Sequence, residues 1–423
     1  MNSEVELRES GIPWIGLIPV SWEIQKLKYH VERHEPRNPG NMEVLSLYRE
    51  FGIVPKNSRD DNHNVTSLDT SSYKYVVPGN FVVNKMKAWQ GSVAVSDYRG
   101  IVSPAYYVYR FTNDMLVPKY LHYLLRSCYR DEFRRLSHGI REGQWDLSSD
   151  ELENVSILIP SKQEQEEIVH YVEAKAKEID ELIGLKQTQL STLESYKQSV
   201  IFEAVTKGLN PAVEMGDSGI QWVSIIPRHW QKHPLYYYFN EVKNKNSRSL
   251  ESNLLSLSYG KIIRKNINNL EGLVPDNFSA YNIVDSGDIV LRLTDLQNDQ
   301  HSLRTGLVTE RGIITSAYVT LRPNALFESS YAKYLLHAYD VAKVLYGMGS
   351  GVRQSLNYSE LSKLPIIEPP LEEQKAISEF LDKKVTEIDE LIELKKKQLD
   401  TLAEYRKSLI YEVVTGKREV PEL

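Results

Sequence analysis

The chain has 423 residues, of which 41% are hydrophobic and 26% are charged, and its formal net charge is −6. This composition is ordinary for a folded protein of two or three domains, and it excludes collagen-like and disordered chains. The single cysteine, Cys128, excludes an internal disulfide and any metal site built from several cysteines. The start carries no apolar run, and no stretch approaches the ~20 apolar residues of a membrane span, so we expect a cytoplasmic protein without a membrane partner.

Residues 1–160 form the first predicted domain, which mixes short strands with a short helix. Runs of β-branched and aromatic residues at 81–83, 101–111 and 155–159 predict strands, and the stretch 118–137 predicts a helix. Gly, Pro, Asn and Asp separate these runs. We therefore expect an irregular, mixed α+β domain.

A long helix is predicted over residues 161–207, with Ser161 as its N-cap and Gly208 as its stop. Acidic side chains outnumber basic ones in it, and apolar residues at steps of three and four form a single stripe. At 1.5 Å per residue, such a helix is about 65 Å long, more than a compact domain of this size needs. The stripe therefore requires a partner, and we assign these residues to a helix seam: Ile168, Val172, Ile179, Ile183, Leu190 and Leu193.

The same pattern returns about 209 residues later, as a second domain over 208–370 and a second helix over 371–416, before a tail at 417–423. The hexapeptide Glu178–Ile183 recurs identically as Glu387–Ile392. Strand-like runs at 289–293 and 313–321 and a helical stretch at 330–346 follow the order of the first domain. The chain is thus a duplication of one long unit.

The second helix repeats the apolar stripe of the first, so the two copies are the natural partners for each other. We expect them to pair as an antiparallel coiled coil, which gives the chain an internal pseudo-two-fold repeat. The seam residues of the second helix are Ile377, Leu381, Ile388, Ile392, Leu399 and Leu402.

Catalytic motifs are missing from the sequence. Neither a Gly-x-Gly-x-x-Gly nor a Gly-x-x-x-x-Gly-Lys-Ser/Thr phosphate-binding motif occurs, and no His-x-His pair could start a zinc site. The Pro369-Pro370 pair lacks the flanks that amino-methyltransferases use to hold a flipped base. We therefore expect a protein that is not an enzyme and has no metal site and no cofactor of its own.

The ordered double occurrence of these motifs resembles the DNA-specificity subunit of type I restriction–modification systems, over the whole chain. The helices at 163–205 and 372–414 resemble the two spacer regions of that family, each with a Pro-x-x-x-Glu-Gln lead-in, at Pro160–Gln165 and Pro369–Gln374. The Gly-Ile-Pro-Trp opening at Gly11–Trp14 resembles the start of its target-recognition domain. Two positions depart from the repeat: Gln221 replaces Pro13, and Gly184 stands where the second helix has Glu393.

The resemblance implies a non-catalytic bacterial or archaeal subunit that reads double-stranded DNA for its partners. Each domain would read one half of a bipartite, asymmetric target. The helices would set the spacer between the halves and dock two methyltransferase subunits, which bind S-adenosylmethionine. Restriction subunits, which use ATP and Mg²⁺, would join through the complex.

Two other classes of protein remain open from the residues alone. The helices would suit a coiled-coil scaffold that binds proteins and no DNA, although two domains of about 160 residues are then unexplained. A fused methyltransferase or nuclease is a weaker alternative, because the motifs it requires are missing.

The DNA-binding residues are predicted from their chemistry and from their recurrence in both domains. Arg, Lys, Asn, Gln and Thr can read base edges or hold phosphates, and aromatic residues can pack on bases. The loop after the run at 81–83 and its positional partner after 289–293 carry such residues, as do two glycine-containing loops before the last strands. The predicted set is Lys56, Arg59, Lys85, Lys87, Trp89, Gln90, Arg141, Gln144, Lys261, Arg264, Lys265, Arg292, Thr294, Gln297, Asn298, Arg353 and Gln354.

Overall fold

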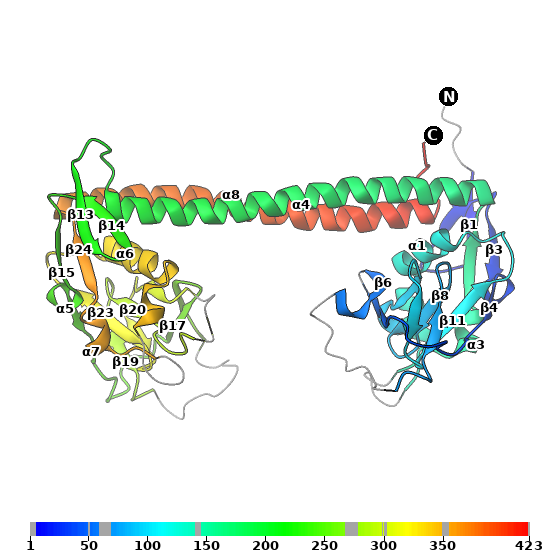
Figure 1. Cartoon of the computed structure of the whole chain (residues 1–423), viewed down its shortest axis with the longest axis horizontal. Coiled ribbons are helices and arrows are strands. Elements are labelled where there is room, and N and C mark those ends of the chain that lie inside the picture. The colour runs from blue at the N-terminus through cyan, green and yellow to red at the C-terminus, as the bar shows by residue number, and fades with distance from the viewer. Residues whose placement is uncertain are drawn as a thin grey trace. The chain divides into compact units, whose positions relative to one another are not determined.

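The computed structural model describes residues 6–49, 51–58, 69–139, 145–266, 278–297, 299, 303–348 and 355–421. The chain divides into two compact units, one formed by residues 1–186 with 397–423 and the other by residues 187–396. Each unit therefore holds one α+β module together with one half of each long helix (Figure 1). In the described ranges, no helix combines the length and the apolar character that crossing a membrane would require.

The module of the first unit is built on a four-stranded antiparallel sheet in the order β4-β11-β8-β9. Helix α1 lies along the β9 edge of this sheet. Smaller two-stranded sheets pair β1 with β2, β3 with β12, β5 with β6 and β7 with β10. The elements are β1 (Leu7–Glu9), β2 (Leu17–Pro19), β3 (Glu23–Lys26), β4 (Val31–Arg33), β5 (Leu45–Tyr48), β6 (Gly52–Pro55), β7 (Lys74–Val76), β8 (Phe81–Asn84), β9 (Val93–Val95), β10 (Gly100–Val102), β11 (Tyr106–Phe111), α1 (Pro118–Cys128), α2 (Arg130–Leu136), α3 (Ser149–Glu153) and β12 (Ser156–Ile159).

The four-stranded sheet is buried on both faces. Alternate side chains of a strand point to opposite sides, so neighbouring residues of β8 enter different cores. Phe81 and Val83 of β8 belong to the core shared with α1 and with the long helices. Val82 belongs to a second core that includes Leu47 and Ile53 of the β5–β6 hairpin. The sheet therefore separates a layer that faces the helices from a layer that contains the hairpin.

The module of the second unit repeats this architecture strand for strand. Its four-stranded sheet has the order β16-β23-β20-β21, and the pairs β13–β14, β15–β24, β17–β18 and β19–β22 match the small sheets of the first unit. The elements are β13 (Met215–Ile220), β14 (Val223–Pro227), β15 (Gln231–Pro234), α5 (Leu235–Tyr238), β16 (Phe239–Glu241), β17 (Leu255–Ser258), β18 (Lys261–Arg264), β19 (Asn282–Val284), β20 (Ile289–Leu291), β21 (Thr305–Leu307), β22 (Gly312–Ile314), β23 (Val319–Pro323), α6 (Ser329–Val341), α7 (Tyr358–Leu361) and β24 (Pro365–Glu368).

Two of the predicted strands are wrong as single elements. The run 101–111 splits into β10 and β11, and 313–321 splits into β22 and β23, with the two pieces in different sheets. Turns cause both breaks, since the amide of Tyr106 donates to the carbonyl of Ser103 and that of Tyr318 to the carbonyl of Thr315. The apolar character of both runs hid these turns.

The long helices are α4 (Lys162–Lys207) and α8 (Leu371–Val414), within two residues of the predicted helical stretches 163–205 and 372–414. The amide of Glu164 donates to Ser161 Oγ at 3.3 Å, as expected of an N-cap. Gly208 and Gly416 follow the two helices with φ of +74° and +70°, the left-handed conformation in which a glycine ends a helix.

Within each unit the two helices run antiparallel. In the first unit Asp180 of α4 pairs with Arg406 of α8 at 3.0 Å, and Lys186 Nζ donates to Gln398 Oε1 at 2.9 Å. In the second unit Lys197 pairs with Asp389 at 2.6 Å, and Lys395 donates to Gln189 at 2.8 Å. These contacts agree with the antiparallel part of the expectation, while regular coiled-coil packing along the whole length stays a prediction.

The predicted seam residues range from buried to half-buried. Those with buried side chains are Ile168, Val172, Ile179, Ile377, Leu381, Ile388 and Ile392. Those that are half-buried are Ile183, Leu190, Leu193, Leu399 and Leu402.

A buried glutamine fastens each module to the start of a long helix. Gln165 Nε2 donates to the carbonyls of Met115 and Pro160, and its Oε1 accepts from the amide of Val117. Gln374 makes the equivalent contacts with Leu326, Pro369 and Glu328. A buried amide must satisfy its donors and acceptor, and these contacts tie the first turn of each long helix to the segment just before α1 or α6.

Candidate nucleic-acid interface

In the first module, the predicted loop 84–90 follows β8 and folds back on itself. The indole Nε1 of Trp89 donates to the carbonyl of Met86 at 3.1 Å, and its ring meets that of Trp145 edge-on, with centroids 5.7 Å apart. Lys85 Nζ lies 3.6 Å from the carboxylate of Asp146. The loop is therefore joined to the segment that precedes the last strand, although Arg141 and Gln144 themselves lie outside the described residues.

The β5–β6 hairpin adds a second element to this loop, which the sequence did not predict. Arg49 at the hairpin turn donates to the side-chain oxygen of Gln90 at 3.0 Å, and Arg126 of α1 donates to the carbonyl of Arg49. The predicted residue Lys56 lies at the far end of the same hairpin and is half-buried. Arg59 lies outside the described residues.

The second module brings together the same three segments. The amide of Leu356 donates to the carbonyl of Leu293 at 2.9 Å, which is the counterpart of the bond from Leu147 to Lys85 in the first module. The tip of the β17–β18 hairpin lies against Leu303. The approach at Gly260 is close, because a side chain added there would place its Cβ only 3.2 Å from the Cβ of Leu303. We call the hairpin and the adjoining loop of each module its loop face.

The predicted residues of the second loop differ in exposure. Arg292 and Thr294 are half-buried, and Arg292 lies 3.6 Å from the carboxylate of Asp299. Gln297 is exposed. The predicted contacts Asn298, Arg353 and Gln354 lie outside the described residues.

Arg304 organises this loop and was missed in the sequence. Its side chain is fully buried, and its Nη1 donates to the carbonyls of Arg292 and Thr294 at 3.0 and 2.8 Å. Its Nη2 donates to the carbonyls of Asp295 and Asp299, and its Nε to the hydroxyl of Tyr346. A guanidinium carries five donors in a fixed plane, so one side chain can hold a loop by several carbonyls at once. A lone arginine before a strand gives no signal of this role.

Ion pairs separate the predicted cations into two groups. Arg264 is engaged with the carboxylate of Glu310, which raises the pKa of the arginine and lowers that of the glutamate. Lys87, Lys261 and Lys265 are exposed, and no carboxylate of a described residue pairs with them. These three lysines are therefore better suited to meet phosphates than Arg264.

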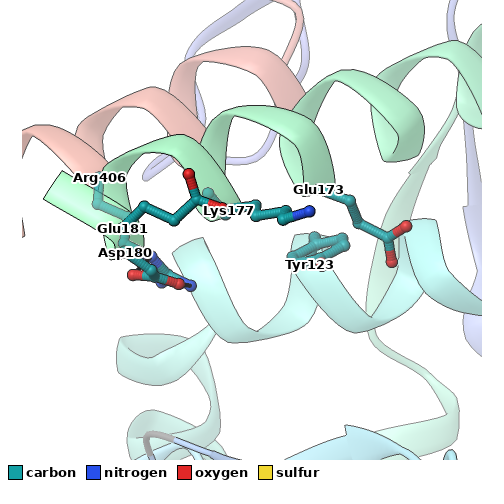
Figure 2. Close-up of a pocket in the computed structure, with 7 residues that line it drawn as sticks. Tyr123, Glu173, Lys177, Asp180, Glu181 and Arg406 are labelled. Atoms are coloured by element: carbon teal, nitrogen blue, oxygen red, sulfur yellow. Dashed lines mark hydrogen bonds and ion pairs between the residues drawn. The ribbon is translucent and has the colours of Figure 1, made fainter. Parts of the chain in front are cut away.

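A depression of about 560 Å³ lies where α1 of the first unit meets the long helices (Figure 2). Carboxylates of Glu173, Asp180 and Glu181 line it with Lys177 and Arg406, and burial beside Glu173 raises the pKa of Tyr123 to about 12. In the second unit Tyr334 and Asp382 correspond to Tyr123 and Glu173, and the hydroxyl of Tyr334 donates to Asp382 Oδ1 at 2.7 Å. The depression therefore lies at a contact between module and long helices that occurs in both units. Across the described ranges, no three His, Cys, Asp or Glu side chains form a group suited to a metal ion.

The long helices also expose apolar side chains at equivalent positions. On α4 these are Leu182, Leu185 and Tyr196, and on α8 they are Leu391, Leu394 and Tyr405. Leu185 is 62% exposed and Leu394 is 50% exposed. At ~100° per residue, Leu185 points about 120° away from Glu173, the residue beside α1, so this face does not cover the module. We group these exposed side chains by unit, and call Leu182, Leu185 and Tyr405 the apolar patch of the first unit, and Leu391, Leu394 and Tyr196 that of the second.

Comparison with known proteins places these features in a family. The family model of the type I restriction modification DNA specificity domain matches twice, over residues 29–194 and 240–404. A putative type I restriction enzyme MjaX specificity subunit from Methanocaldococcus jannaschii is 23% identical over 442 aligned positions, which cover 96% of each chain.

Solved structures show the same fold at low identity. A chain from a study of complex assembly and conformational transition of the type I R-M system superposes with a TM-score of 0.68 and 16% identity, covering 95% of this chain and 99% of that one. The HsdS subunit from Thermoanaerobacter tengcongensis superposes with a TM-score of 0.54 and 16% identity, covering 95% and 98%.

Proposed function

The chain belongs to the family of type I restriction–modification DNA specificity subunits, and on that premise we propose that its two modules each read one half of a bipartite, asymmetric DNA target. The modules are those predicted over residues 1–160 and 208–370. In this proposal the chain is not itself an enzyme. It supplies sequence recognition to catalytic subunits in the cytoplasm of a bacterium or archaeon.

The observation that carries this proposal is the repeated loop face with different side chains. In both modules a β-hairpin contacts the loop that follows one central strand of the sheet, β8 in the first module and β20 in the second. Where the first module has Lys85-Met86-Lys87, the second has Leu293-Thr294-Asp295. Different donors and acceptors on the same framework read different bases, so the two half-sites should differ in sequence.

The two apolar patches support docking of two methyltransferase subunits. Each patch combines two leucines of one long helix with a tyrosine of the other, and the two sets are related by the repeat. Exposed apolar side chains at equivalent positions are typical of sites that bind two copies of one partner. The methyltransferase subunits would carry S-adenosylmethionine, and restriction subunits with ATP and Mg²⁺ would join through the assembled complex.

The long helices would set the spacer between the half-sites. Their length and their antiparallel contacts within each unit suit a stiff element, and the buried glutamines Gln165 and Gln374 tie the start of each helix to its module. The number of unread base pairs would then depend on helix length.

Co-expression with a methyltransferase subunit of a type I system from the same host tests the proposal. We expect the two proteins to co-purify, to shift a duplex that carries the target, and to methylate adenines in a two-part motif that sequencing of the host genome reveals. Co-purification without retention of any duplex would instead identify a protein-binding scaffold. Activity of the chain without a partner would contradict its non-catalytic role.

A further inference from the structure

The hairpin of the second module ends in an unusual residue. Tyr259 and Gly260 form the two-residue turn between β17 and β18, with φ of +46° and +75°. Positive φ at both central positions defines a type I′ turn, which strongly prefers Asn-Gly or Asp-Gly. A bulky side chain in this conformation is a backbone outlier.

The fold gains almost nothing from the tyrosine ring. Tyr259 is 85% exposed, so its side chain contributes little to the core. Asparagine would suit the turn better, because its short side chain tolerates positive φ. Strained residues cluster at active sites and ligand clamps, so a strained and exposed tyrosine points to a role in binding.

The surroundings of the tip suit a nucleic-acid partner. On the outward side of the hairpin, Lys261 and Ile263 are exposed, and Ser258 pairs with Lys261 across the turn. The tip lies against Leu303, directly before Arg304, whose guanidinium holds the loop 292–299. A cation, hydroxyls and an aromatic ring thus stand next to the loop that the proposed function assigns to base reading.

The first module shows the same arrangement with another aromatic residue. Phe51 is 52% exposed in the turn of the β5–β6 hairpin, and Gly52 follows it with φ of +71°. Arg49 of this turn donates to Gln90 in the adjacent loop. An exposed aromatic residue at the hairpin turn therefore recurs on both loop faces, although the two turns differ in length.

We propose that Tyr259 is a DNA-contact residue of the second module, whose ring packs in the groove against the bases and sugars next to those read by loop 292–299. The inference rests on the proposed function and adds a contact outside the predicted DNA-binding set. In a duplex groove an aromatic ring packs on sugars and on apolar base edges such as the thymine methyl, while lysines such as Lys261 hold the adjacent phosphates.

The test compares three variants of the full chain, each in complex with its methyltransferase. Tyr259→Asn removes the ring and relieves the turn, Tyr259→Phe keeps the ring, and Tyr236→Asn changes another exposed tyrosine of the same unit. The probes are a duplex with the mapped target and a random duplex of equal length, and Tm is measured in parallel. We expect Tyr259→Asn to keep or raise Tm and to weaken target binding roughly tenfold, as the loss of one base-edge contact does, with the other two variants within twofold of wild type.

The outcomes separate the inference from the proposed function. Wild-type complex that does not prefer the target duplex would reject the function itself. Wild-type binding that Tyr259→Asn leaves unchanged would reject the contact alone. If Tyr259→Asn lost binding and also had a lower Tm, the tyrosine would serve the fold. If Tyr259→Phe lost binding as strongly as Tyr259→Asn, the contact would be made by the hydroxyl and not by the ring. Either result overturns the inference.

Discussion

Arg304 shows at the residue scale how a buried charge can shape a surface loop. Its guanidinium is satisfied almost entirely by backbone carbonyls of residues 292–299, and its amide donates to Asp340 Oδ2 at 2.7 Å. Carbonyls held in this way cannot rearrange without losing their donor. The backbone of the loop is thereby held in one conformation without the help of a partner.

Replacing Arg304 by methionine should lower the free energy of unfolding by roughly 2–4 kcal/mol, because several buried carbonyls lose their donor at once. Urea denaturation followed by circular dichroism measures this change. Arg228→Met is the control, since Arg228 is exposed and its ion pair with Glu214 should contribute less than about 1 kcal/mol. Equal effects of the two substitutions would show that the arginine does not hold the loop.

Among the predicted cations, the exposed Lys87 and the ion-paired Arg264 should behave differently in DNA binding. Lys87→Ala should reduce the slope of log K against log salt by about one unit without changing the preferred sequence, as the loss of a phosphate contact does. Arg264→Ala should change the slope less, because its charge is already neutralised by Glu310. Affinity measured over a series of salt concentrations decides between them, and an unchanged slope for Lys87→Ala would remove this lysine from the interface.

At the scale of elements, each long helix carries two apolar surfaces with different expected roles. The seam residues Ile179 and Ile388 are buried, whereas the patch residues Leu185 and Leu394 are exposed. The same substitution should therefore destabilise the chain at a buried seam residue and weaken partner binding at an exposed patch residue.

Ile179→Asp or Ile388→Asp should abolish solubility and assembly together, because a carboxylate in the seam costs several kcal/mol. Leu185→Asp, or Leu394→Asp, should leave the chain soluble with an unchanged Tm and reduce co-purification of the methyltransferase. Size-exclusion chromatography of the co-expressed proteins reads both effects. Normal assembly of the Ile179→Asp variant would refute the seam, and normal assembly of a double Leu185→Asp, Leu394→Asp variant would refute the docking patch.

At the scale of the whole molecule, the proposed spacer role makes helix length the quantity to vary. Adding one heptad to both helices keeps the seam in register and lengthens each by about 10 Å. With a base-pair rise of about 3.4 Å, the unread spacer should grow by roughly three base pairs, while both half-sites keep their sequences. Genome-wide mapping of methylated adenines tests this. An unaltered spacer would contradict the role of the helices, and altered half-sites would show that the helices take part in reading bases.

The duplication, the two long helices and the α+β character of the modules could all be predicted from the residues alone. Helix stripes such as Ile168 to Leu193 depend on local periodicity, and the repeat depends only on matching residues, so both are visible without coordinates. The structure places both long helices within two residues of their predicted ends.

The make-up of each loop face could not be predicted, because it depends on contacts between segments far apart in the chain. The hairpin at Arg49 meets Gln90, 41 residues away, and Arg264 is neutralised by Glu310, 46 residues away. Such pairings depend on how the sheets stack, and no local pattern reports them. For the same reason, the sequence could predict cations at the interface but could not show which were already paired, nor that Arg304 and the hairpin tip at Tyr259 belong beside them.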